Sequence, residues 1–360
     1  VVCEAGCILQ ALDTYLAEQG FMVPLDLGAK GSCQIGGNVA TNAGGLRLVR
    51  YGSLHGTVLG LEAVLADGTV LSDLKSLRKD NTGYHLSQLL IGSEGTLGLI
   101  TKVAIATPRR SKSVQVAVVA CKTFEEVLSS VEVARRSLSE IISAVEFLDR
   151  SCLELVVAEH GLRDPMGEQH AFYLLVETSG SNAEHDQAKL ELFLEQCMTE
   201  GFVQDGVVAQ DGAQAGELWK LREKIPLALQ QRGKVFKYDL SLPMDAMYAL
   251  VEDVQARLAA PFPAAKVYGY GHLGDGNLHL NITAPLDAPP ALLAAIEPFV
   301  YQWTAEKRGS ISAEHGVGVM KAPHLHLSKS GEMLELMRKV KDAYDPNGIL
   351  NPYKMLPPPP

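Results

Sequence analysis

The sequence predicts a protein of mixed α and β structure, and three observations support this fold class. From about residue 112 onward, strand-like apolar stretches alternate with stretches of helical periodicity. Asp67-Gly68 stands between two strand-like segments and is a strong signal for a two-residue hairpin. Thr123-Phe-Glu-Glu126 is a capping box, which marks the start of a helix. The pattern alone leaves a parallel doubly wound sheet open, because strand direction cannot be derived from it.

The first 110 residues are expected to form one unit. The apolar spacing near the start predicts a helix that ends at Gly20. Three strands are predicted in this part, at residues 57–66, 69–74 and 99–107.

The elements expected after residue 112 alternate in type. Strands are predicted at residues 114–120, 172–177, 202–209 and 235–242. Helices are predicted at residues 123–138, 183–200 and 217–231, and from Pro243 onward. Helices dominate from about residue 290, and Pro357–Pro360 is expected to be a disordered tail.

Composition sets limits on the class of function. A chain of 360 residues can hold two or three cores of ordinary domain size. Its net charge of −10 argues against a nucleic-acid partner, and no apolar run is long enough to span a bilayer. The six cysteines form no CxxC and no zinc-ribbon spacing, so reduced thiols are expected.

A histidine cluster is the strongest chemical signal. Leu278-His279-Leu280-Asn281 predicts a strand whose polar side chains share one face. His272 lies an odd number of residues from His279, which would put the two on opposite faces of a straight strand, but Gly274-Asp-Gly-Asn277 between them is a turn that could bring them together. With Glu314 they supply three ligands suited to a catalytic divalent metal, and His315 is a spare imidazole. A single histidine is more often a core or surface residue; the combination favours the metal site.

A glycine-rich stretch precedes this cluster in the chain. Eight glycines fall within 29 positions, interleaved with small hydrogen-bonding residues, from Gly28 to Gly56. Such a segment lets backbone N–H groups approach a ligand closely, as phosphate sites require. It matches neither the Rossmann nor the P-loop pattern, so by itself a surface loop is the better interpretation.

Taken together, these segments resemble the flavoproteins of the vanillyl-alcohol-oxidase type, in the branch that oxidises D-2-hydroxy acids. The motifs that carry the resemblance run in order along the whole chain: Pro24-Leu-Asp-Leu-Gly28, Ile35-Gly-Gly-Asn-Val-Ala-Thr-Asn-Ala-Gly-Gly45, Gly92-Ser-Glu-Gly-Thr-Leu-Gly98, Gly271-His-Leu-Gly-Asp-Gly-Asn-Leu-His279, Ser312-Ala-Glu-His-Gly316 and Gly348-Ile-Leu-Asn-Pro352.

The resemblance implies an α+β fold. Residues 1–110 would be the second part of an FAD-binding domain, and residues 111–288 a substrate domain with a mainly antiparallel sheet and covering helices. Residues 289–360 would be a small helical segment that returns to the flavin. Family members begin with a further half of the FAD domain, so the chain is expected to be N-terminally incomplete.

The resemblance also assigns residues to FAD. The motif positions that would line the cofactor are Pro24, Gly36, Gly37, Asn38, Thr41, Asn42, Gly45, Glu94, Gly95, Ile100 and Asn351. Asn351 would reach the isoalloxazine ring from the C-terminal segment.

For the chemistry, we expect FAD to take the Cα hydride of the substrate. His272, His279 and Glu314 would hold a divalent metal, with Zn²⁺ the first choice for this N/O ligand set. The metal would acidify the 2-hydroxyl, and His315 would be the general base. Asn281 would hydrogen-bond the substrate.

Within the branch, Leu221-Arg222 and Lys237-Tyr-Asp-Leu-Ser-Leu-Pro243 resemble members that act on D-2-hydroxyglutarate. Arg222 and Lys237 are therefore candidates for binding a distal carboxylate, against the alternative of a solvated helix face and a strand-edge charge. Pro226 stands where such members often carry a threonine. D-lactate dehydrogenases and glycolate oxidase subunits remain competitors.

Two further classes stay open. A flavin-free metallohydrolase could use the same ligand set but leaves the glycine-rich segment unexplained. A truncated, inactive chain that only folds or binds a partner is the other. The resemblance implies electron transfer flavoprotein as the electron acceptor, in the mitochondrial matrix.

Overall fold

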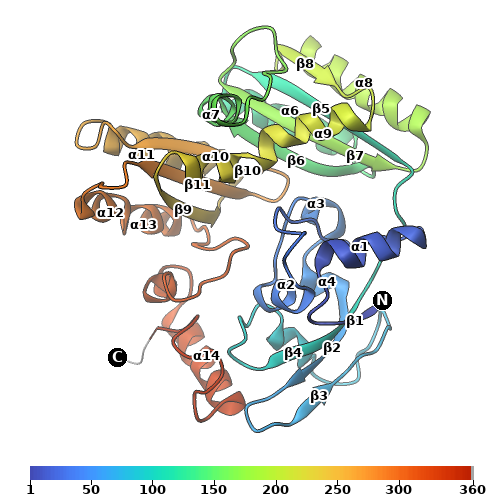
Figure 1. Cartoon of the computed structure of the whole chain (residues 1–360), viewed down its shortest axis with the longest axis vertical. Helices are drawn as coiled ribbons and strands as arrows, with labels where there is room; N and C mark the ends of the chain where they lie inside the picture. Colours follow the sequence, from blue (N-terminus) through green and yellow to red (C-terminus); the bar gives the residue numbers. More distant parts are fainter. Residues whose placement is uncertain (358–360) are drawn as a thin grey trace. The chain divides into compact units, whose positions relative to one another are not determined.

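The computed structural model describes residues 1–357, which divide into two compact units (Figure 1). Unit 1 combines Val1–Arg110 with the chain from Ile311 onward, and unit 2 is Ser111–Ser310. Residues 289–310, assigned above to the C-terminal segment, belong to unit 2. Of the tail predicted to be disordered, residues 358–360 lie outside the described residues.

Unit 1 is built on a four-stranded antiparallel sheet in the order β1-β4-β2-β3. The strands are β1 (Val2–Glu4), β2 (Val58–Val64), β3 (Val70–Ser72) and β4 (Leu99–Ile105). β2 and β3 flank Asp67-Gly68, and Gly68 has a φ of 85°, which glycine adopts without strain. The predicted hairpin is present, but a two-residue turn is wrong, because Val64 pairs with Val70 and the Leu65 N–H donates to the carbonyl of Thr69.

The helices of unit 1 pack on this sheet and around its loops. They are α1 (Leu9–Glu18), α2 (Ile35–Thr41), α3 (Leu48–Tyr51), α4 (Leu54–Thr57), α5 (Ser87–Leu90), the 3-10 helix η2 (Ala322–Leu327) and α14 (Gly331–Tyr344). Leu9, Leu12 and Leu16 face the core, which confirms the helix predicted there. Val340 and Tyr344 of α14 pack against the same core, so the C-terminal segment is part of this unit.

Unit 2 contains a seven-stranded sheet in the order β8-β5-β7-β6-β10-β11-β9. Its strands are β5 (Ser113–Cys121), β6 (Ile142–Asp149), β7 (Phe172–Gly180), β8 (Asp205–Val208), β9 (Lys234–Ser241), β10 (Lys266–His272) and β11 (Asn277–Ala284). Every pair of neighbours is antiparallel, which excludes the doubly wound sheet and confirms the α+β class.

Helices cover both faces of this sheet. They are α6 (Phe124–Ser137), α7 (Arg150–His160), α8 (Ala183–Thr199), α9 (Gly212–Glu223), α10 (Ile225–Gln231), the 3-10 helix η1 (Met244–Ala246), α11 (Met247–Ala259), α12 (Pro290–Ile296) and α13 (Phe299–Glu306). α7, α9 and α10 bury leucines against one face. On the other face Phe124 of α6 stacks on Tyr248 of α11, with ring centroids 5.4 Å apart. Within the described residues, no helix is both long and apolar enough to cross a membrane.

Two helix predictions have different outcomes. The capping box is present, because Thr123 accepts a hydrogen bond from the Glu126 N–H and the Glu126 side chain accepts one from the Thr123 N–H. The single helix predicted over residues 217–231 is wrong, since α9 ends at Glu223 and α10 begins at Ile225. Pro226 has no N–H to donate to the carbonyl of Arg222, which breaks the helix there.

Asp149 connects three elements of unit 2 through a buried carboxylate. It accepts hydrogen bonds from the N–H of Cys152 in α7 (2.9 Å) and the N–H of Gly269 in β10 (2.8 Å). The Tyr248 hydroxyl lies 3.3 Å from the same carboxylate. Burial raises the pKa of Asp149 to about 6, although these hydrogen bonds favour the ionised form.

This raised pKa predicts a specific pH dependence of stability. The neutral acid stabilises the fold, so its contribution is complete below an unfolded pKa of about 3.9 and is lost as pH rises through about 6. The difference between a pKa of about 3.9 and one of about 6 corresponds to about 3 kcal/mol of unfolding free energy. Relative to Asp149→Asn, the native chain should therefore lose up to about 3 kcal/mol of unfolding free energy between about pH 4 and pH 7.

The measurement is urea unfolding followed by tryptophan fluorescence. Both tryptophans of the chain, Trp219 and Trp303, lie in unit 2, so the signal reports on the unit that contains Asp149. Parallel pH profiles for the native chain and Asp149→Asn would contradict the prediction.

Candidate functional site

The histidines of unit 2 come together through the β10–β11 hairpin. His272 pairs with Asn277, and Tyr270 pairs with His279, so both imidazoles lie on one face of the sheet. Their Nε2 atoms are 3.2 Å apart. The turn predicted between the two histidines is confirmed, and it removes the conflict caused by their odd spacing.

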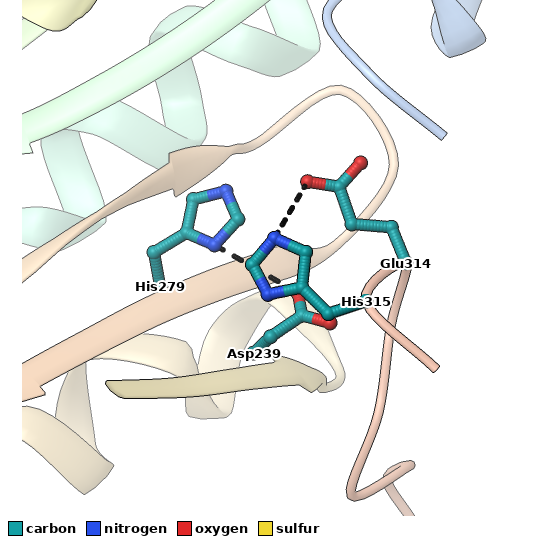
Figure 2. A group of neighbouring side chains, drawn as sticks. All are labelled: Asp239, His279, Glu314 and His315. Carbon is teal, nitrogen blue, oxygen red and sulfur yellow. Dashed lines mark ion pairs between the residues drawn. The ribbon is translucent and has the colours of Figure 1, made fainter. Parts of the chain in front are cut away.

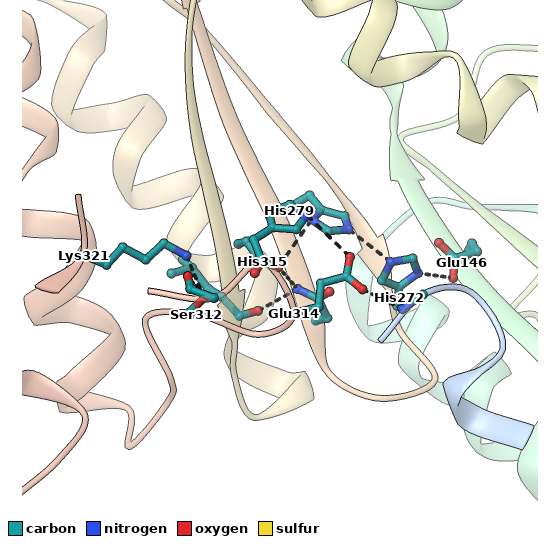
Figure 3. A network of polar contacts seen from close by, with 12 residues as sticks. Glu146, His272, His279, Ser312, Glu314, His315 and Lys321 are labelled. Atoms are coloured by element: carbon teal, nitrogen blue, oxygen red, sulfur yellow. Dashed lines mark hydrogen bonds and ion pairs between the residues drawn. The ribbon is translucent and has the colours of Figure 1, made fainter. Parts of the chain in front are cut away.

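The buried carboxylate of Glu146 contacts the Nδ1 side of the His272 ring (Figure 3). Glu146 of β6 places Oε1 2.7 Å from Nδ1 of His272 and accepts a hydrogen bond on Oε2 from Nε of Arg222, at 2.8 Å. Since a carboxylate only accepts, Nδ1 of His272 carries a proton, and the neutral form of the ring has its lone pair on Nε2. Arg222, from α9, also lies over the Tyr270 ring, 4.5 Å from the centroid.

Within each unit, groups that can ligate a metal stand in pairs (Figure 2). In unit 2, Oδ1 of Asp239 is 3.7 Å from Nδ1 of His279 and accepts a hydrogen bond from the Asn277 side chain at 2.9 Å. In unit 1, Oε1 of Glu314 is 3.7 Å from Nε2 of His315. His279 and Asp239 are buried, whereas the His315 side chain is 59% exposed.

Two residues of unit 2 that are candidates for binding the substrate lie opposite each other on neighbouring strands. Lys237 of β9 pairs with Asn281 of β11, two residues along from the Asp239–His279 pair. Alternation therefore puts all four side chains on one face of the sheet. Asn281 is buried and Lys237 is exposed. Arg222 reaches the same face from α9, where its Nε is bonded to Glu146.

In unit 1 the glycine-rich segment forms α2 and the loop after it. Packing requires glycine at position 36, because a Cβ on Gly36 would lie 2.5 Å from the Cβ of Ala5. Gly37 is exposed with open space around its Cα. Asn38 is buried, and Thr41 bonds back to the carbonyl of Gly37 at 3.1 Å. Of the two glycines in α2, Gly37 is the one without an internal steric reason to be glycine.

The loop after α2 has two unusual features. Asn42 is left-handed, with a φ of 50°, and its Oδ1 is buried with no hydrogen-bond partner among the described residues. Gly45 has a φ of 79°, and a Cβ there would lie 2.3 Å from the carbonyl of Asp26. Pro24 and Ile100 are buried in the same unit.

Glu94 joins the glycine-rich segment to the C-terminal segment inside unit 1. Its backbone N–H donates to the carbonyl of Ala40 at 2.7 Å, and its carboxylate accepts from the N–H groups of Val317 (2.5 Å) and Gly318 (2.7 Å). Its carbonyl accepts from the Asn351 side chain, and Gly95 lies beside Asn351.

Glu314 is also tied to the glycine-rich segment. Its Oε2 accepts a hydrogen bond from the N–H of Gly45 at 2.6 Å. The loop that carries it is held internally, since Lys321 donates to the Ser312 hydroxyl (2.9 Å) and that hydroxyl donates to the carbonyl of Gly316 at 2.5 Å (Figure 3). Three residues that contact the histidines or their partners in unit 2 are not predicted from the sequence: Glu146, Asp239 and Asn277. A lone carboxylate inside the apolar run 142–148 was the available signal for Glu146.

Comparisons with known proteins place the chain in a family. Residues 110–355 match the model of the C-terminal domain of FAD-linked oxidases, and residues 1–73 match that of an FAD-binding domain. Among solved structures, alkyldihydroxyacetonephosphate synthase is similar in fold, with a TM-score of 0.72 at 16% identity over 98% of this chain and 64% of that protein.

Curated relatives are similar in sequence. Mitochondrial D-2-hydroxyglutarate dehydrogenase of Bos taurus is 58% identical over 99% of this chain, and that of Arabidopsis thaliana is 56% identical over 99%. The chain spans slightly less than two thirds of their own length, 65% and 63% respectively. Because the FAD-linked oxidase model matches more than half of its residues, the chain belongs to the FAD-linked oxidase family.

Proposed function

We propose that the chain catalyses the FAD- and metal-dependent oxidation of D-2-hydroxyglutarate to 2-oxoglutarate. One observation carries the proposal: two buried imidazoles with adjacent Nε2 atoms stand in a chain that is 58% identical to a relative named for this activity. The other proposed site residues lie in the two matched regions, residues 1–73 and 110–355, except Glu94, Gly95 and Ile100.

The residues of unit 1 fit a bound FAD in two respects. The Oδ1 of Asn42 is a buried acceptor that lacks a donor among the described residues, and a flavin ring or ribose could supply one. Gly37 is open to solvent, so a ligand could approach the backbone there as closely as glycine allows. The proposed FAD residues are those named above, with Glu94 fixing Asn351.

The histidines of unit 2 fit a tetrahedral metal. Two nitrogens that each lie about 2.0–2.1 Å from Zn²⁺ are separated by roughly 3.3 Å, and the two Nε2 atoms are 3.2 Å apart. Glu146 leaves the His272 lone pair on Nε2, as metal-ligating histidines require. We propose His272, His279 and Glu314 as ligands; the third rests on the family motif around Glu314.

The residues then divide the reaction between them. FAD, when bound, accepts the hydride that leaves Cα, and the metal, when bound, lowers the pKa of the 2-hydroxyl. His315 takes the hydroxyl proton on an imidazole nitrogen. Asn281 donates a hydrogen bond to the substrate from its buried position. Hydride and proton loss together convert the alcohol carbon to a carbonyl.

The distal carboxylate distinguishes this substrate from lactate. Lys237 is exposed and positively charged on the face that carries Asn281. Arg222 has five N–H donors, of which Nε–H is given to Glu146. We propose that these two cations bind the distal carboxylate, against the net charge of −10 of the whole chain.

The relatives' names support a mitochondrial location, and we propose the same for this chain. Reduced flavin must pass its electrons on, and we propose electron transfer flavoprotein as the acceptor.

The first prediction tests the function itself. The protein loaded with FAD and Zn²⁺ should be yellow, and D-2-hydroxyglutarate should bleach the flavin absorbance under anaerobic conditions. The L enantiomer is the matched control, because it presents the same carboxylates with the Cα hydrogen in another position. A colourless protein, or bleaching by D-lactate at equal efficiency, contradicts the proposal.

A second prediction concerns His315. Its side chain is 59% exposed, so His315→Ala should fold normally and bind zinc like the native protein. Loss of the general base should lower kcat by roughly 10²- to 10⁴-fold. Stopped-flow reduction of the flavin and zinc content by mass spectrometry measure the two effects. Retained turnover would rule out His315 as the base.

A third prediction concerns the distal carboxylate. Arg222→Ala should raise KM for D-2-hydroxyglutarate roughly 10- to 100-fold, the loss expected for one charge-assisted hydrogen bond, and far less for D-lactate. Lys237→Ala should likewise raise KM more for D-2-hydroxyglutarate than for D-lactate. Because Lys237 is exposed and is not bonded to Glu146, this variant removes a proposed carboxylate-binding cation without breaking a contact of Glu146. Equal increases in KM for both substrates would show that Arg222 does not bind the distal carboxylate.

A further inference from the structure

Glu146 lies where a charge is costly. It sits in the middle of β6, a strand that is buried along its whole length, and its exposed fraction is 0%. A carboxylate withdrawn from water loses several kcal/mol of solvation unless well-placed donors replace the water. Hydrophobic residues would fill this position without that cost, so the carboxylate needs an explanation beyond packing.

The two oxygens of Glu146 have different partners. Oε1 faces Nδ1 of His272 at 2.7 Å, and Oε2 faces Nε of Arg222 at 2.8 Å. The first partner is a proposed metal ligand and the second a proposed substrate residue. Both partners are themselves buried, so water does not screen either contact.

We propose that Glu146 is a positioning residue that couples the metal ligand His272 to the carboxylate-binding Arg222. Its Oε1 keeps the His272 proton on Nδ1 and leaves Nε2 to the metal. Its Oε2 holds the Arg222 guanidinium against the Tyr270 ring. The inference deepens the proposed function and rests on it for the roles of the two partners.

Unit 2 contains a matched carboxylate that lacks these roles. Glu177 of β7 is buried on the same face of the sheet, two residues along from Leu175, which pairs with Glu146. It accepts hydrogen bonds from Nε1 of Trp219 (2.9 Å) and the Ser143 hydroxyl (2.7 Å). Trp219 and Arg222 both belong to α9. Neither partner of Glu177 is a proposed site residue.

The test compares Glu146→Gln with Glu177→Gln. Glutamine has the same shape, but an NH2 donor replaces one of the two oxygens, so at the position of Glu146 it faces either His272 or Arg222 with a donor in place of an acceptor. In E146Q we expect zinc affinity, measured by chelator competition, to fall about 10- to 100-fold. The preference in kcat/KM for D-2-hydroxyglutarate over D-lactate should fall as well. E177Q should change neither quantity, whatever its effect on stability.

A second readout does not depend on metal or substrate. Nitrogen NMR of 15N-labelled histidine reports which ring nitrogen carries the proton in the zinc-free protein. We expect His272 to be protonated on Nδ1 in the native chain, with part of this population moving to Nε2 in E146Q. If E146Q does not fold, Glu146→Asp keeps the charge but withdraws it by one methylene, and it should also bind zinc more weakly than the native chain.

The outcomes separate the two proposals. Native zinc affinity in E146Q or E146D, an equal loss in E146Q and E177Q, or an unchanged His272 tautomer would overturn the role of Glu146. A native chain that binds zinc but does not oxidise D-2-hydroxyglutarate would overturn the proposed function alone, and the E146Q effects on zinc affinity and tautomer would still stand.

Discussion

The carboxylate of Glu146 constrains the register of the sheet around it. Its two donors come from β10 and α9, so both elements must lie correctly for either hydrogen bond to form. His272 is directly opposite Glu146 in the β10–β6 ladder. A slip of one residue would turn the imidazole to the other face and leave a buried charge unpaired. The contact between Glu146 and His272 therefore favours one register of the β6–β10 pair more strongly than apolar packing alone would.

The same register brings the histidines together, and glycine makes the hairpin tight enough. A Cβ at Gly271 would lie 2.1 Å from the carbonyl of Asn277 on the facing strand. Gly276 has a φ of 79° in the turn. Arg135 of α6 donates to the carbonyl of Gly274 at 3.1 Å and ties the turn to the body of unit 2. The glycines of this motif thus serve the approach of the two strands, and the imidazoles follow from it.

How far the sequence predicts this arrangement depends on the range of the interactions. The Asp67-Gly68 hairpin and the capping box at Thr123 are decided within a few residues, and both are present. The pairing of β6 with β10 joins segments more than a hundred residues apart, and no local pattern encodes it. The sequence does not predict β6, because this strand is buried on both faces and shows no alternation. The role of Glu146 is not predicted for a different reason, since its partners come from distant elements.

Each unit orders its own share of the proposed site residues. In unit 2, Glu146 fixes His272 and Arg222, and Asp239 stands beside His279. In unit 1, Glu314 is held by the N–H of Gly45, and Glu94 receives the Asn351 side chain. Side chains held by local hydrogen bonds lose little further freedom when a ligand binds, so less binding energy is spent on ordering them. His315 and Lys237 are exposed, and both are proposed to contact the substrate directly. The hydrogen-bonded side chains are those proposed to hold metal and cofactor, and the two exposed ones are those proposed to contact a substrate that exchanges at every turnover.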